Sequence, residues 1–228
     1  EPNVLELCDE MVEKSHFVVL KLSPMLDWHS AVIQLKYVTE VHIISVGNEC
    51  KELLLVLTNR NKTDKDNKTN TIKVFCINDN DIFSYEEDIH SEKEGLLQQN
   101  ILSKDVALPP FLYEPNASIM KAGCFAQLSE TYGVAALGHN SHLFVSPDFL
   151  PHFPGRKSQI VNVCTLNKKE LRRALAGITQ ANIAVRNFPM RVDELKKRLK
   201  LRDGGEHYIF ATTRGDKEHI LIISKKEV

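Results

Sequence analysis

Two short, almost continuously apolar runs enclose a segment of helical spacing near the start of the chain. The runs cover residues 17–22 and 41–46, and the helical segment begins at Asp27 and places Trp28 on its inner side. Apolar runs of this length, rich in β-branched residues, are typical of strands that are covered on both faces, as in a parallel sheet. Their alternation with helices predicts an α/β fold for this part of the chain.

The residues around these runs predict the closing half of a doubly wound, Rossmann-like sheet. A helix is expected over residues 3–14 and a further strand over residues 71–77. Residues 51–58 follow the second run so closely that the connection cannot carry a parallel crossover, so they predict an antiparallel neighbour. Since no strand precedes the first helix and the chain starts at Glu1 rather than Met, we expect a piece of a larger protein.

Two polar tracts interrupt the predicted elements. Residues 59–70, rich in Asn, Lys, Asp and Thr, predict a solvent-exposed hairpin loop. Residues 79–108 are acidic and weakly periodic, and predict a linker between compact units.

The second half of the chain predicts an α+β unit. Strands are expected at residues 111–114, 142–146, 159–164 and 181–186, with helices at 118–132 and 168–178. This order, βαββαβ, is that of a ferredoxin-like unit. A helix over residues 191–201, stopped by Gly204 and Gly205, and a hairpin over residues 207–224 follow it.

Charge is divided unequally along the chain. Residues 156–228 carry 17 Lys or Arg against 8 Asp or Glu, whereas the whole chain has a formal net charge of -1. Clustered cations attract phosphates and release their counterions, which favours a polyanion as partner. The same cations also fit a solvated helix face that favours the helix macrodipole. The sequence leaves both interpretations open.

The densest cations follow the predicted strand at residues 181–186. Phe188 offers a ring that can stack on a base, although it can equally hold the entry of the next helix by packing. The solvent-facing cations of that helix suit phosphate contacts. The candidate RNA-binding residues are Arg186, Asn187, Phe188, Arg191, Lys196, Lys197, Lys200 and Arg202.

A second set of candidates lies where predicted strands end. Open α/β sheets place ligands at the carboxyl ends of their strands. The same residues also fit helix caps and polar turns, and capping alone explains Asp27 well. The candidate substrate-side residues are Ser23, Pro24, Asp27, Asn48, Glu49, Glu114 and Asn116.

The sequence offers no motif for a metal or for nucleotide phosphates. Its nine His and five Cys show no H-x-x-x-H, H-E-x-x-H or C-x-x-C spacing, so we interpret the Cys as small buried residues. No closely spaced glycines join a strand to a helix. No apolar run approaches the roughly 20 residues of a membrane span. We therefore expect a cytoplasmic protein without a metal and without membrane contact.

Five stretches carry a resemblance to a known family. The chain resembles the C-terminal part of bacterial class I S-adenosylmethionine-dependent methyltransferases that carry a THUMP-like domain. The stretches are KLSPMLDW, SVGNECKELLLVL, YEPNASIMKAG, NSHLFVS and VRNFPMRVDELKKRLKLRDGGEHYIFATT. The resemblance implies a Rossmann-like catalytic sheet, then a ferredoxin-like subdomain, then a THUMP-like module.

The resemblance also implies domain boundaries. Residues 1–78 would form a partial Rossmann-like methyltransferase domain, residues 79–108 the acidic linker, and residues 109–157 the first part of the ferredoxin-like subdomain. Residues 158–228 would form the THUMP-like domain and complete the βαββαβ unit.

The resemblance implies that the full-length parent is an RNA methyltransferase. S-adenosylmethionine would bind to the parent, at motifs that lie before residue 1, so no catalytic or cofactor-binding residue is expected in this chain. We therefore expect an inactive, substrate-recognising fragment whose basic module binds RNA. Two alternatives stay open: a non-catalytic protein-interaction or small-ligand regulatory module, and a methyltransferase acting on a protein or small molecule.

Overall fold

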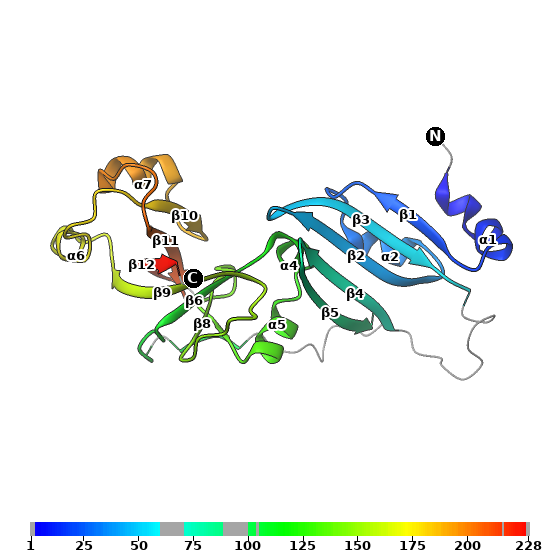
Figure 1. Ribbon diagram of the computed structural model, residues 1–228, viewed down its shortest axis with the longest axis horizontal. Helices are drawn as coiled ribbons and strands as arrows, with labels where there is room; N and C mark the ends of the chain where they lie inside the picture. The colour runs from blue at the N-terminus through cyan, green and yellow to red at the C-terminus, as the bar shows by residue number, and fades with distance from the viewer. Residues whose placement is uncertain (1–2, 60–70, 89–99, 104, 216, 227–228) are drawn as a thin grey trace. The chain divides into compact units, whose positions relative to one another are not determined.

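The computed structural model describes residues 3–59, 71–88, 100–103, 105–215 and 217–226 (Figure 1). They divide into two compact units. Unit 1 comprises Glu1–Leu96 and Asn116–Cys124, and unit 2 comprises Leu97–Pro115 and Phe125–Val228. A short segment from the second half of the sequence thus completes the first unit.

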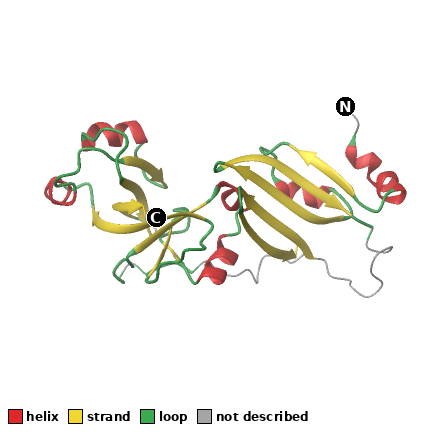
Figure 2. Ribbon diagram, viewed as in Figure 1, coloured by secondary structure: helices red, strands yellow, loops and turns green. Residues whose placement is uncertain are grey.

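Unit 1 is built on a mixed sheet with the strand order β1-β3-β2-β4-β5. Strands β2 and β4 run parallel, and the other neighbouring pairs run antiparallel. Figure 2 shows this sheet and its helices by secondary-structure colour. In chain order, the elements are α1 (Val4–Lys14), β1 (Val18–Leu22), α2 (Trp28–Gln34), β2 (Val38–Val46), β3 (Glu49–Leu57), β4 (Thr71–Asn78), β5 (Asp81–Asp88) and α4 (Ala117–Ala122).

Strand β1 differs from the sequence prediction. It lies at the edge of the sheet, antiparallel to β3, and is not covered on both faces, because half-buried and exposed residues alternate along it. Strand β3 stands between β1 and β2, so these two strands run in the same direction without being neighbours. Phe17 and Val19 consequently leave large apolar side chains exposed.

Strand β3 confirms the predicted antiparallel neighbour of β2, since Val46 and Glu49 are register partners at their hairpin. The prediction of a linker from residue 79 was wrong over residues 81–88. These residues form β5, which pairs antiparallel with β4 along its whole length. From Phe83 onward, exposed Ser84, Glu86 and Asp88 alternate with more buried residues, because one face of this edge strand is solvated. The predicted loop over residues 59–70 lies almost entirely outside the described residues.

Helices α2 and α4 pack into the core of unit 1. Trp28, Ala31 and Val32 are buried along the predicted inner face of α2. The Trp28 indole N–H donates to the carbonyl of Ala122 at 3.4 Å, which links α2 to the end of α4. Asp27 caps α2 by accepting from the backbone N–H of His29 at 3.1 Å.

Unit 2 is built on a sheet with the strand order β10-β11-β12-β9-β6-β8-β7. Strands β10 and β11 run parallel, and the other neighbouring pairs run antiparallel. In chain order, the elements are β6 (Phe111–Pro115), α5 (Phe125–Tyr132), β7 (Ala135–Ala136), β8 (Phe144–Ser146), β9 (Gly155–Cys164), α6 (Lys168–Ala174), β10 (Asn182–Arg186), α7 (Val192–Leu199), β11 (His207–Arg214) and β12 (Glu218–Lys226).

The predicted elements of this unit occur in the predicted order, but three details differ, the first of which is the unpredicted short strand β7. One helix was predicted over residues 118–132, whereas α4 ends at Ala122 and is capped by Gly123 with a positive φ of 73°, and α5 begins at Phe125. A glycine adopts this left-handed conformation without the strain of a side chain. Strand β10 pairs with β11, which follows it in the chain, so the strands of the predicted βαββαβ unit continue into the hairpin as one sheet.

The sheet of unit 2 buries apolar residues on both faces. Ile209 and Ala211 of β11 belong to one core cluster, and Phe210, between them, belongs to another on the opposite face. Helices α6 and α7 cover the first face, where Leu195 and Leu199 of α7 are buried. These helices therefore present their other sides to solvent.

Helix α7 ends earlier than predicted. Its last residue is Leu199, and Lys200 forms the cap with a positive φ of 56° instead of the expected stop at Gly204 and Gly205. The backbone N–H of Lys200 donates to the carbonyl of Lys196 at 2.9 Å, which satisfies one of the terminal carbonyls. The predicted hairpin of β11 and β12 is confirmed.

Candidate nucleic-acid interface and sheet-edge residues

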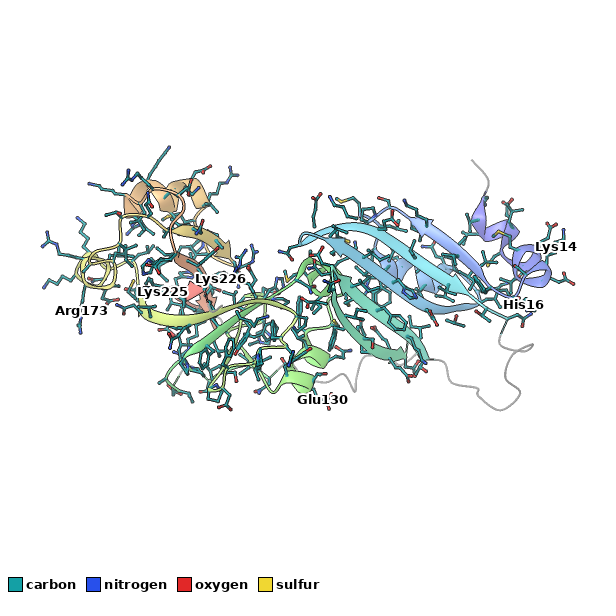
Figure 3. The ribbon with its side chains drawn as sticks, viewed as in Figure 1. Lys14, His16, Glu130, Arg173, Lys225 and Lys226 are labelled. Atoms are coloured by element: carbon teal, nitrogen blue, oxygen red, sulfur yellow. The ribbon has the colours of Figure 1, made fainter. Side chains whose placement is uncertain are left out.

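Helices α6 and α7 carry cations on the sides that do not face the sheet. Asn167 caps α6 by accepting from the backbone N–H of Lys169 at 2.9 Å. Leu171 and Ala174 face the core cluster, and the intervening positions carry exposed cations. The side chains of α6 project outward in Figure 3, where Arg173 is labelled. The exposed cations of the two helices are Lys168, Lys169, Arg172, Arg173, Lys197 and Arg198.

A groove of about 560 Å³ lies between α6 and α7. We call it the α6–α7 groove. Thr179 contributes a hydroxyl to its wall. Its cations are Arg172, Arg198, Lys200 and Arg202, and its apolar lining consists of Leu171, Leu175, Ile178, Leu199 and Leu201. A polyanion would meet four positive side chains above an aliphatic floor.

Most of the cations on α6, on α7 and in the segment after α7 lack a carboxylate partner. Lys196 pairs with Asp203 at 2.9 Å, and Arg198 donates to the carbonyl of Leu166 at 3.4 Å. Within the described ranges, no Asp or Glu lies within ion-pair distance of Arg172, Lys200 or Arg202. Unneutralised cations that converge on one groove raise the local concentration of phosphates.

The predicted RNA-binding residues divide among three surroundings. Lys200 and Arg202 line the α6–α7 groove, whereas Lys197 and Arg191 are exposed outside its lining. Lys196 is engaged by Asp203. Sequence reasoning missed the groove cations Arg172 and Arg198. Arg172 lies in α6, where cations alternate with leucines as they do in α7. The sequence pattern that identified the cations of α7 could therefore also have identified Arg172.

Arg186, Asn187 and Phe188 have other partners. Phe188 is partly buried against the core cluster of α6 and α7, and its ring meets His219 edge-on at 5.5 Å between centroids. It therefore packs rather than presenting a free ring. Asn187 is exposed with a positive φ of 49°, and its carbonyl accepts from the hydroxyl of Thr213.

Arg186 is joined to Glu114, a residue from the other predicted set. Arg186 Nη2 donates to Glu114 Oε1 at 2.8 Å, and Arg156 Nη1 donates to Glu114 Oε2 at 2.9 Å. The Glu114 side chain is 9% exposed. The structure thus places Glu114 in an ion cluster of unit 2.

In unit 1, the residues after β1 lie beside an apolar pocket of about 220 Å³. Asp27 contributes a carboxylate and Ser30 a hydroxyl-bearing side chain to the lining of this pocket. Leu20, Leu22 and Leu26 are among its apolar lining residues. The Ser30 hydroxyl donates to Asp27 Oδ2 at 3.0 Å, and this hydrogen bond lowers the pKa of the Asp27 carboxyl. Asp27 is therefore a carboxylate at neutral pH, capping α2 at the rim of the pocket.

The Ser23 hydroxyl supports the turn that connects β1 to α2. Its Oγ accepts from the backbone N–H of Met25 at 3.3 Å, with Pro24 between them. Among the described residues, Met25 is the most exposed of the large apolar side chains, at 87%. This segment is thus a tight turn that displays an apolar tip next to the pocket.

Asn48, at the turn between β2 and β3, contacts the start of α4. Its Oδ1 accepts from the backbone N–H of Ala117 at 2.8 Å, and Asn116 Oδ1 accepts from the backbone N–H of Ile119 at 3.2 Å. Asn116 is buried, and its Nδ2 has no hydrogen-bond partner among the described residues. Glu49 is exposed and pairs with Lys51 at 2.6 Å. Within unit 1, the structure therefore brings together Asn48 and Asn116.

Neither a metal centre nor a membrane span is found in the described part of the chain. No group of three or more His, Cys, Asp or Glu side chains there could hold a metal ion. No helix among the described residues is long and apolar enough to cross a membrane.

Two family models match parts of the chain that lie mostly in unit 2. Residues 111–154 match a family model described as a ferredoxin-like domain, and residues 155–226 match one described as THUMP domain-like. No curated protein matches the sequence significantly. The chain is therefore a mixed α/β protein with two sheets that contains a ferredoxin-like and a THUMP-like domain.

A solved structure resembles nearly the whole chain. It is that of a putative methyltransferase from Porphyromonas gingivalis W83, with a TM-score of 0.82 and 28% sequence identity over 98% of this chain. The matched region is 54% of the Porphyromonas chain, so this chain spans about half the length of that protein.

Proposed function

We propose that this chain is the substrate-recognising portion of an S-adenosylmethionine-dependent methyltransferase that acts on RNA. The α6–α7 groove binds backbone phosphates of the RNA. The observation that carries the proposal is the convergence of Arg172, Arg198, Lys200 and Arg202 on one groove, without carboxylate partners for Arg172, Lys200 and Arg202 in the described ranges.

The comparisons support this proposal at two levels. The groove lies within residues 155–226, which match the THUMP-like model, and a domain of this kind suggests contact with RNA. The likeness to the putative methyltransferase from Porphyromonas gingivalis covers both units and suggests methyl transfer as the reaction of the whole protein.

The methyl donor would bind to parts of the whole protein outside these residues. Nucleoside-containing ligands of α/β proteins are commonly bound beside glycine-rich turns between a strand and a helix, and this sequence has no such turn. In unit 1, Asp27 and the turn around Asn48 then lie on the substrate side of the sheet, where a carboxylate and an amide can accept hydrogen bonds from a base.

A titration with structured RNA at low ionic strength tests the groove. Reversing two groove cations, R172E with R198E, should weaken binding at least about 30-fold. It should also lower the salt dependence by about two phosphate contacts. The matched control is R173E with K197E, which changes the same charge on the same two helices outside the groove lining.

The control should weaken binding less than about fivefold, through the general field alone. Equal losses in both double variants would reject a specific groove, and undetectable binding of the unchanged protein would reject RNA recognition. Circular dichroism shows whether each variant is folded. Methyl transfer itself is measured on RNA with the whole protein and a labelled methyl donor. Absence of RNA labelling alongside labelling of protein would reject RNA as the substrate.

A further inference from the structure

Arg156 and Arg186 lie on the face of the unit 2 sheet opposite to α6 and α7. Residues of a strand alternate between its faces. In β10, Ile183 and Val185 pack on the cluster of α6 and α7, whereas Ala184 packs on the opposite cluster, so Arg186 shares the face of Ala184. In β9, Ile160 belongs to the same opposite face. Arg156 precedes it by an even number of residues, and its contact with Glu114 places it there as well.

Glu114 holds the two guanidinium groups next to one another. Each carboxylate oxygen accepts from one of them, at 2.9 Å from Arg156 and 2.8 Å from Arg186. Two cations share one anion, so the cluster has a local charge of about +1. His142 adds no positive charge at neutral pH, because its pKa is lowered, chiefly by burial and also by the charge of Arg186.

The guanidinium groups retain N–H donors that no described residue accepts. Each guanidinium has five N–H donors. The hydrogen bonds within the described residues occupy Nη1 of Arg156, and Nη2 and Nη1 of Arg186, the last toward the Val185 carbonyl at 3.2 Å. Nε of Arg186 is shielded from solvent without a partner. Side-chain exposures of 37% for Arg156 and 39% for Arg186 leave both groups accessible.

The aromatic ring of Tyr208 packs against the guanidinium group of Arg156. The Arg156 guanidinium carbon lies 5.0 Å from the centroid of the Tyr208 ring, a cation–π contact. Glu114 and Tyr208 together limit the rotamers of Arg156, so less conformational entropy is lost when an anion binds. Guanidinium groups that are fixed in orientation, accessible to solvent and left with unused N–H donors are well suited to bind phosphate.

We propose that Arg156 and Arg186 form a second phosphate-binding site, which takes a phosphodiester of RNA on the sheet face opposite the α6–α7 groove. The choice of a diester follows from charge, since its single negative charge neutralises the cluster. A dianionic phosphate monoester would leave a net negative charge beside Glu114. This assignment rests on the proposed function for the identity of the polyanion, and the geometry of the cluster carries the site itself.

Side-chain NMR of the arginines of the 228-residue chain tests the site directly. The probes are the RNA dinucleotide UpU, which has one phosphodiester, and inorganic phosphate at pH 8. We expect the Nε–H signals of Arg156 and Arg186 to shift with UpU at concentrations several-fold below those needed with inorganic phosphate. Equal or stronger response to inorganic phosphate would overturn the diester assignment in favour of a free phosphate.

The groove provides an internal reference for the same titration. If Arg172 and Arg198 respond to UpU while Arg156 and Arg186 do not, the second site is refuted and the proposed function survives. If Arg156 and Arg186 respond while the groove residues do not, the groove is refuted and the second site survives. Silence of all four refutes both.

A double variant checks the site in RNA binding. Replacing Arg186 alone would leave Glu114 with one partner and could unfold the unit, so E114Q is combined with R186Q to remove both charges together. This exchange leaves the local charge at about +1, carried by Arg156, so the salt dependence of RNA binding should change little, whereas affinity should fall about fivefold to tenfold with the loss of one guanidinium fork. R186K, which keeps the charge and loses the fork, should lose affinity with little change in salt dependence. An unchanged affinity in both folded variants would contradict the proposal.

Discussion

Arg186 in β10 and Glu114 in β6 are joined by a hydrogen bond of 2.8 Å, although 72 positions separate them in the sequence. Strands β11, β12 and β9 lie between β10 and β6 in the sheet. In a flat sheet four strand spacings would separate the two strands by about 19 Å. The two side chains span only part of that distance, so the sheet of unit 2 curves, and the ion cluster bridges two strands that are not neighbours.

Loss of the shared carboxylate should destabilise unit 2. The E114A variant leaves Arg156 and Arg186 adjacent and without their common partner. We expect the free energy of unfolding to fall by about 2 kcal/mol, less than for a fully buried pair because both arginines are partly solvated. Urea unfolding followed by circular dichroism measures it. E10Q, which removes an exposed partner of Lys14, should change it by less than about 0.5 kcal/mol.

Gly138 should not tolerate a side chain. A Cβ there would lie 2.7 Å from the carbonyl oxygen of Gly215 and 2.8 Å from that of Thr213. Both contacts are with backbone, so relief requires movement of the β11–β12 hairpin. We expect G138A to cost about 1–3 kcal/mol of stability in thermal or urea unfolding. H139A, at the exposed neighbouring position, should be close to neutral, and equal stability of the two variants would show that the hairpin yields freely.

The cap of α2 should make a pH-dependent contribution to unit 1. Asp27 has a lowered pKa in the folded state, chiefly because Ser30 donates to its carboxylate. A lowered folded pKa stabilises the protein above the unfolded value of about 3.9, and this stability is lost as pH falls through the folded value.

We expect D27A to lower the free energy of unfolding by about 1 kcal/mol at pH 7. The difference from the unchanged protein should shrink as pH falls below about 4. Fluorescence of Trp28, the single Trp of the sequence, reports the transition from within the same helix. D27N keeps an acceptor for the cap and should lose less. A deficit of D27A that stays constant down to pH 3 would contradict the assigned role of the carboxylate.

Cysteine alkylation should be slow and strongly pH-dependent at Cys164. Burial, with the charge of Glu170, raises the pKa of its thiol to about 11. Only about 0.1% would then be thiolate at pH 8, and the alkylation rate should rise about tenfold per pH unit up to pH 10. Cys50 is partly exposed and should react first. Peptide mapping by mass spectrometry measures both, and equal rates in the native protein would contradict the burial of Cys164.

The strands of the core could be predicted from the sequence because their own residues specify them. Apolar runs located β2, β3 and β4, and the hairpin of β11 and β12 followed from a turn between two apolar runs. Strand β5 was missed because it lies at a sheet edge, where exposed acidic side chains hide the alternation. The edge position of β1 depends on β3 inserting beside it, a long-range pairing that no local pattern encodes.

The candidate site was predictable only in part, for the same reason. Lys200 and Arg202 could be found from the local density of cations. Their companions in the groove, Arg172 and Arg198, required knowing that residues of α6 and α7 line one groove. The contact of Glu114 with Arg186 joins one residue assigned to substrate and one assigned to RNA, and it depends on the coiling of the sheet rather than on either neighbourhood.

In helices α6 and α7, leucines that face the sheet and cations that face outward occupy interleaved positions of the same helical turns. Insertion or deletion of one residue in either helix would rotate everything after it by about 100°, moving cations toward the core and leucines into water. Evolution of this surface is therefore expected to proceed by exchange of side chains at fixed length. Length variation between relatives should gather in the connecting loops.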